Sequence, residues 1–170
     1  MSRIGLFTAG ALLASLAGCG GVGASLSPGA SLSPGAGTLT PGCFLTAAEV
    51  ESATGHALST PPEGSTGPKG DQSCSYALTG GVVVGFGGHG LSTNGPFDLQ
   101  GQGTAWLNNL PPGGQTVPGV GDGAYFLMQS TASDFWAVKG QIGIHISIAF
   151  QSLTVEQFTT LANAAFGRLS

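Results

Sequence analysis

The clearest alternation of apolar and polar residues runs over residues 141–150. The apolar positions are Ile142, Ile144, Ile146, Ile148 and Phe150. Strict alternation of this length predicts a long β-strand with one face on the core of the protein. Residues 134–139 are expected to form its hairpin partner, with the turn at Lys139 and Gly140.

Three shorter stretches also predict strands. Residues 73–78 alternate with period two and place Cys74, Tyr76 and Leu78 on one face. A turn at residues 79–81 leads into residues 82–87, and together these stretches predict a second hairpin. Residues 124–128 form a further apolar strand.

Helical signals lie near both ends of the folded part. Thr46 and Glu49 have the spacing of a capping box, which predicts a short helix over residues 47–53 that ends at Gly55. Thr154 and Gln157 repeat this spacing before a last helix. Its apolar residues recur at helical intervals: Val155, Phe158, Leu161, Ala162, Ala165 and Phe166.

The remaining stretches carry weaker patterns. Residues 56–72 hold three prolines and are expected to be a loop, and residues 88–90 open a polar loop. Residues 97–110 predict a poor helix that carries Trp106 and is weakened by Gly101 and Gly103. The order of the elements predicts an α+β fold for residues 43–170, with an antiparallel sheet of about five strands packed by an N-terminal and a C-terminal helix.

Composition excludes one class of partner. Only 7% of the residues are charged. Beyond the N-terminal region the basic side chains are Lys69, Lys139 and Arg168, against eight acidic residues. A weakly acidic chain with scattered basic residues has no electrostatic surface for nucleic acid.

The first 19 residues have the pattern of an export signal. Arg3 precedes an uncharged apolar run from about residue 4 to residue 17, and the run ends in Leu16, Ala17, Gly18 and Cys19. This pattern predicts a signal peptide over residues 1–18, because the run is too short for a mature membrane-spanning helix of about 20 residues. An ordinary signal peptide that happens to end in a cysteine is the alternative.

The Leu-Ala-Gly-Cys ending resembles the lipobox of bacterial lipoproteins. The resemblance implies a diacylglyceryl group on the thiol of Cys19, cleavage just before Cys19, and a chain anchored to the extracytoplasmic face of the cell membrane. An anchor with at least two acyl chains would hold the protein durably.

Residues 19–42 are rich in glycine, serine and proline and contain a direct repeat, residues 24–29 and 30–35. Such composition cannot bury enough apolar surface to offset the entropy of ordering, so it predicts a disordered tether after the lipidated cysteine. A glycosylated stalk is the alternative.

Cys43 and Cys74 are the two cysteines that follow the tether. An even pair in an exported chain predicts a disulfide, which would stabilise the fold by about 3–4 kcal/mol in the chain-entropy model. A redox or metal-binding pair is the alternative.

Several short motifs resemble actinobacterial (mycobacterial-type) cell-envelope lipoproteins with a two-cysteine domain of unknown function. They are the lipobox, the tether, Cys43 with residues 45–50, Cys74 before an aromatic strand, residues 117–125, and residues 153–157 of the last helix. The resemblance spans most of residues 43–169. It implies an envelope location and a disulfide, and it supplies no catalytic residue.

Motifs for known chemistry are absent from the sequence. It contains no G-x-S-x-G, H-E-x-x-H or P-loop. Residues 119–123 have alternating glycines, but a strand rather than a helix follows, so they predict a turn and no dinucleotide site. His56, His89 and His145 are too dispersed to predict a metal site. We expect no cofactor and no metal.

Two functions remain. The first is a non-catalytic binding module for an apolar envelope ligand or an envelope protein, with five candidate aromatic residues: Phe97, Trp106, Phe126, Phe135 and Trp136. The second is a cell-envelope hydrolase that would join His145 or His89 to Asp134 and a serine. We favour the binding module and expect that the protein is not an enzyme.

Overall fold

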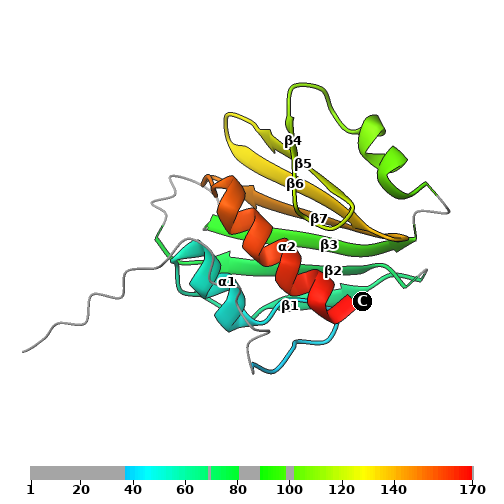
Figure 1. The fold of residues 1–170 in the computed structure, drawn as a ribbon. Helices are drawn as coiled ribbons and strands as arrows, with labels where there is room; N and C mark the ends of the chain where they lie inside the picture. Colours follow the sequence, from blue (N-terminus) through cyan, green and yellow to red (C-terminus); the bar gives the residue numbers. More distant parts are fainter. Residues whose placement is uncertain (1–36, 69, 81–88, 99–101, 170) are drawn as a thin grey trace, which may run out of the picture. The chain divides into compact units, whose positions relative to one another are not determined.

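The computed structural model describes residues 37–68, 70–80, 89–98 and 102–169 (Figure 1). In chain order the elements are α1 (Ala47–Thr54), β1 (Glu63–Thr66), β2 (Gln72–Leu78), β3 (His89–Asp98), the 3-10 helix η1 (Gly103–Asn109), β4 (Gln115–Val117), β5 (Gly123–Met128), β6 (Ala132–Lys139), β7 (Ile142–Ala149) and α2 (Val155–Leu169). The α+β class with an antiparallel sheet is confirmed.

The described strands form a seven-stranded sheet in the order β1-β2-β3-β7-β6-β5-β4, and every pair is antiparallel. The expected number of about five strands was too low because the two edge strands, β1 and β4, were not predicted. The sequence of β1 has no alternation of apolar and polar residues, since all four of its residues are exposed and none has to pack in the core. The prediction of a loop over residues 56–72 was therefore wrong for residues 63–66.

The hairpin of β6 and β7 is confirmed, with Lys139 opposite Ile142. Ile144, Ile146 and Ile148 are almost fully buried. The apolar face does not extend to the end of the alternation, however. Phe150 lies beyond β7 with 62% of its surface exposed and a positive φ of 62°, so its expected place on the buried face was wrong.

The expected strand over residues 82–87 lies outside the described residues. Besides β1, the partner of β2 is β3, which was expected to begin in a polar loop. This prediction was wrong because β3 contains residues that are rare in strands, including Asn94 and Pro96. The pairing of β3 with β7 shifts register between Asn94 and Phe97, and this irregularity accommodates the proline in an interior strand.

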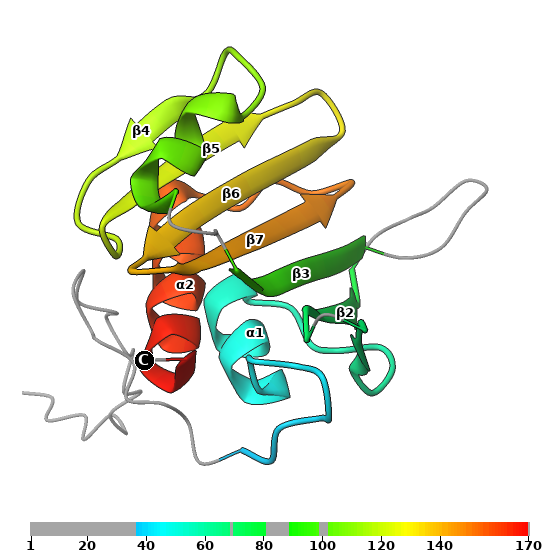
Figure 2. The same cartoon turned by 90° about the vertical axis from the view of Figure 1, so that its right-hand side faces the viewer.

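Both α-helices lie on the same face of the sheet (Figures 1 and 2). The capping box of α1 is confirmed, since Glu49 N donates to Thr46 Oγ1 and Glu49 Oε2 accepts from Thr46 N, and Gly55 ends the helix in the left-handed conformation. The main core lies between these helices and the sheet. At its centre Phe158 of α2 stacks on Phe135 of β6, with ring centroids 5.4 Å apart.

The opposite face of the sheet is covered in part by η1, which packs on β5 and β6 (Figure 2). The poor helix expected over residues 97–110 is in fact a 3-10 helix that begins at Gly103. The Tyr125 hydroxyl fixes the segment after η1, because it donates to Pro111 O at 2.6 Å and accepts from Gly114 N at 2.8 Å.

Residues 118–122 connect β4 to β5, so the expected turn is confirmed. Asp122 ties this turn to the neighbouring hairpin: its backbone N donates to Val138 O at 2.7 Å, and its Oδ2 accepts from Gly140 N at 2.6 Å. Gly121 has a positive φ of 53°, and a Cβ there would lie only 2.2 Å from Val138 O. The glycine is therefore needed for the close approach and not for phosphate binding.

Candidate functional site

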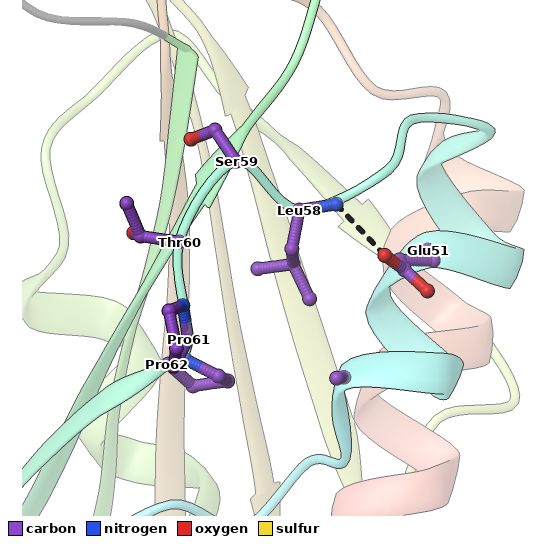
Figure 3. Close-up of a pocket in the computed structure, with 7 residues that line it drawn as sticks. Glu51, Leu58, Ser59, Thr60, Pro61 and Pro62 are labelled. Carbon is purple, nitrogen blue, oxygen red and sulfur yellow. Dashed lines mark hydrogen bonds between the residues drawn. The ribbon is translucent and has the colours of Figure 1, made fainter.

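An open groove of about 310 Å³ lies between α1 and the segment that follows it (Figure 3). Its lining residues are Ala47, Glu51, Leu58, Ser59, Thr60, Pro61 and Pro62. The side chain of Leu58 projects into the space between α1 and the two prolines. The groove is therefore mainly apolar and accessible from solvent.

Local backbone contacts position the outer wall of this groove. Ser59 N donates to Ala77 O at 2.8 Å, and Thr79 N donates to Ala57 O at 2.7 Å, so residues 57–59 follow the end of β2. On the helix side, Glu51 Oε1 accepts from Leu58 N at 2.8 Å. The carboxylate is thus engaged by the backbone, and the groove contains no histidine or cysteine. It can hold an apolar segment but offers no nucleophile–base pair.

A second cluster joins β6 and β7. Asp134 Oδ1 lies 2.8 Å from His145 Nε2, and its Oδ2 accepts from Gln129 Nε2 at 2.9 Å. The His145 ring stacks on Trp136 with centroids 4.7 Å apart and planes within 3°. Trp136 is 9% exposed, so this cluster is largely closed.

The cluster brings together two residues of the hydrolase hypothesis, His145 and Asp134. In a serine-protease triad Nδ1 of the histidine binds the acid and Nε2 faces the nucleophile. Here Nε2 binds the carboxylate instead. The groove of Figure 3 is lined by neither residue, so the acid–base pair does not face it.

The candidate aromatic residues do not share one surface. Phe126 and Phe135 belong to the core beside Phe158, whereas Trp136 stacks on His145 and lies at an angle to the Tyr125 ring. Trp106 is half-buried in η1. The side chain of Phe97, the fifth candidate, lies outside the described residues. A ligand-binding role for these aromatics stays a prediction without a common site.

The cysteine pair is a disulfide. Cys43 and Cys74 are bonded, with Cα atoms 4.9 Å apart, and both are buried. The bond joins the segment before α1 to β2, as predicted. Cys19, the expected lipidation site, lies outside the described residues.

Of the other two histidines, the structure describes the side chain of His56 alone. His56 contacts the Gln151 side chain, and the side chain of His89 is outside the described part of the chain. Within the residues that the structure describes, no three potential metal ligands lie together.

A charged network that sequence reasoning missed joins α1 to α2. Arg168 Nη2 donates to Glu49 Oε1 at 2.6 Å, and Arg168 Nη1 donates to Phe44 O at 3.3 Å. Burial raises the pKa of Glu49, but hydrogen bonds from Arg168 and Thr46 outweigh it and hold the pKa below its usual value of 4.5. Only the capping box gave a sequence signal for Glu49. The network is structural, since it lies among core residues.

Comparisons of the chain with protein-family models, with curated proteins and with solved structures gave no match. No relative therefore supplies a reaction or a ligand. In the described part of the chain, no helix has the length and apolar character needed to cross a membrane.

Proposed function

We propose that this chain is a lipid-anchored lipoprotein on the extracytoplasmic face of the cell membrane and acts there as a non-catalytic binding or accessory module. The observation that carries the location is the buried Cys43–Cys74 disulfide. Disulfides persist in exported proteins and are rare in the reducing cytosol. The lipobox at Cys19 and the resemblance to actinobacterial envelope lipoproteins support the same location.

The groove of Figure 3 supports a binding role. Small-molecule sites usually enclose most of their ligand, whereas this groove is open along one side. Its apolar lining suits a short apolar segment of an envelope protein better than an enclosed lipid. The proposed ligand is therefore a protein partner, and an apolar small molecule is the alternative.

A cell-envelope hydrolase is the second candidate function. The specific observation in its favour is the 2.8 Å contact of Asp134 with His145. Hydrolysis of a short-chain nitrophenyl ester that falls at least 100-fold in His145→Gln and in Asp134→Asn would establish it. Equal background rates in the unsubstituted protein and in the two variants would exclude this function.

The anchor is tested by expressing the full chain in an actinobacterial host. We expect an intact mass in which the chain begins at Cys19 and carries a diacylglyceryl group. In Cys19→Ala the acyl mass should be missing and the protein should leave the membrane fraction. An unmodified chain that begins elsewhere would overturn the anchor.

The groove is tested by photocrosslinking in intact cells from a benzoylphenylalanine at Pro61. Ala47→Glu places a carboxylate in the groove and should abolish the adduct, while acidic residues remain favourable in the first turn of a helix. Ala48→Glu is the matched control, because Ala48 is exposed on the same turn and does not line the groove. Equal adduct in both variants would overturn this site. Native mass spectrometry of the envelope-purified protein tests the alternative, since a retained apolar adduct indicates a small molecule.

A further inference from the structure

Two large apolar side chains are exposed at one end of the sheet. Phe150 is 62% exposed and Met128 is 57% exposed. Met128 pairs with Ser133, which pairs with Ile148 on the next strand, so Met128 and Phe150 lie two strands apart at the same end. We call these two side chains the apolar tip.

The backbone holds Phe150 in an unfavourable conformation. It is the only non-glycine residue of the described chain with a positive φ, at 62°. This region is a genuine outlier for a bulky residue, and such outliers cluster at functional sites. The backbone N of Phe150 donates to Thr131 O at 2.8 Å, which fixes it beside the β5–β6 turn. The protein therefore keeps an aromatic ring exposed in a strained position.

The described residues next to the tip in the sequence are mostly polar and carry no charge. Residues 129–131 and 151–153 contain glutamine, serine, threonine and leucine and no charged side chain. A specific protein interface buries more than about 1,000 Å², which two side chains do not supply. Apolar side chains with a neutral polar rim are suited to an uncharged lipid surface, where the headgroups meet the rim.

The tip lies at the end of α2 that is remote from Gly42, the last residue of the proposed tether. Arg168, near the C-terminus of α2, contacts Glu49 and Phe44 next to the point where the tether enters. At the other end Gln157 Nε2 donates to Ala53 O at 2.9 Å. Phe150 precedes this end, and the 15 residues of α2 span about 22 Å.

We propose that the apolar tip inserts into the lipid surface to which Cys19 anchors the chain, so that the domain lies against the membrane. The proposal rests on the proposed lipid anchor. The 17 residues between Cys19 and Gly37 can extend to about 56 Å, which exceeds the length of α2. Two apolar side chains bind lipid weakly in free solution, but attachment of the chain to the same membrane through Cys19 raises their effective concentration to about the millimolar range.

The test uses the mature lipidated protein in phosphatidylcholine vesicles that contain a dibrominated phosphatidylcholine, which quenches tryptophan within the acyl region. Phe150→Trp supplies the reporter, and the unsubstituted protein gives the background of Trp106 and Trp136. We expect the added emission to shift to shorter wavelength and to fall at least two-fold with the brominated lipid. Leu39→Trp is the matched control, because Leu39 is 40% exposed at the tether end, and its emission should stay unquenched.

An unshifted and unquenched signal from Phe150→Trp on vesicle-bound protein would overturn the tip while leaving the anchor intact. If the emission of Phe150→Trp shifts to shorter wavelength in whole envelopes but not in vesicles, the tip contacts a protein partner, and this result would also overturn the proposal. If the protein does not float with vesicles, the anchor fails. The Phe150→Trp emission is then measured in the Cys19→Ser chain, held on nickel-chelating lipid by an N-terminal hexahistidine. Absence of quenching by the brominated lipid in this chain would again overturn the insertion of the tip.

Discussion

The two ends of α2 are built in opposite ways. At the C-terminal end the buried polar groups have partners and the chain is crosslinked. At the N-terminal end an aromatic ring is exposed on a strained backbone. The first end is where residue 42 leads into the domain, here called the tether end after the proposed tether, and the second end carries the apolar tip.

At the tether end the contacts reinforce one another. Tyr76 is fully buried, and its hydroxyl donates to Leu45 O at 2.7 Å. Burial raises the pKa of this hydroxyl, so it remains a donor at physiological pH. The ion pair of Glu49 and Arg168 is similarly enclosed, with side chains 4% and 16% exposed.

The apolar tip is joined to the rest of the described domain by no disulfide. The left-handed backbone of Phe150 costs about 1–2 kcal/mol, and this cost has to be offset elsewhere in the domain. The disulfide and the charged network at the tether end supply stabilisation of the required size. The comparison therefore suggests that stability is concentrated at one end while the other end is left for contact.

The largest effect is expected from removing the disulfide. In a Cys19→Ser background, Cys43→Ala/Cys74→Ala should lower the free energy of unfolding by about 3–4 kcal/mol, because the loop of 31 residues is no longer closed in the unfolded chain. Urea unfolding measures the difference. Under reducing conditions the two proteins should unfold alike, and a difference that persists there would mean that the cysteines contribute through packing.

Arg168→Met should cost about 2–3 kcal/mol, because it leaves the carboxylate of Glu49 buried without its charged partner. Urea unfolding at pH 7 gives the magnitude. The matched control is Glu49→Gln/Arg168→Met, in which glutamine can keep the capping box and no buried charge remains. The control should lose clearly less stability than the single variant, and an equal loss would contradict an electrostatic role.

The same pair sets a pH dependence. The folded pKa of Glu49 lies below 4.5, so its stabilisation is present above pH 4.5 and is lost as the pH falls through the folded pKa. In Arg168→Met the folded pKa of Glu49 should rise, because only the hydrogen bonds from Thr46 then oppose the effect of burial, so the loss of stability on acidification should be smaller than in the unsubstituted protein. Unfolding measured from pH 3 to pH 7 separates the two slopes.

The elements that could be predicted are those marked by short sequence motifs, such as helix caps and a hairpin turn. The capping boxes before α1 and α2 and the hairpin at Lys139 required only nearby residues. The disulfide required only the count of cysteines and the export signal. The strands β1, β3 and β4 were missed because none of them alternates apolar and polar residues: β1 and β4 are short and mostly exposed, and β3 contains glycine, asparagine and proline.

The candidate sites were harder to predict for the same reason. The groove combines α1 with a proline-containing segment, and neither part has a pattern that indicates the other. The alternation over residues 141–150 was extended one position too far at Phe150. Periodicity follows residue type alone, and it cannot detect that the backbone changes to a positive φ after Ala149.

Phe150→Gly should stabilise the domain although it removes an apolar side chain. Glycine adopts a positive φ without steric cost, and the lost ring is mostly exposed, so we expect a gain of about 0.5–1 kcal/mol in thermal or urea unfolding. Phe150→Ala is the matched control, because it removes the ring and retains the strain, and it should be less stable than Phe150→Gly by about 1 kcal/mol. If glycine and alanine give equal stability, the strain at this position is not significant.

The smallest change in stability is expected for Met128→Ser, within about 0.5 kcal/mol, because the side chain is 57% exposed at the end of β5. Its effect on the lipid contact should be larger. Placed beside the Phe150→Trp reporter, Met128→Ser should reduce the quenching by brominated lipid, because both side chains are proposed to enter the same surface. Ser130→Ala in the neighbouring turn is the control and should leave the quenching unchanged. Unchanged quenching in Met128→Ser would restrict the contact to Phe150 alone, whereas loss of quenching without loss of stability would separate the contact function of this end from the stabilising role of the other.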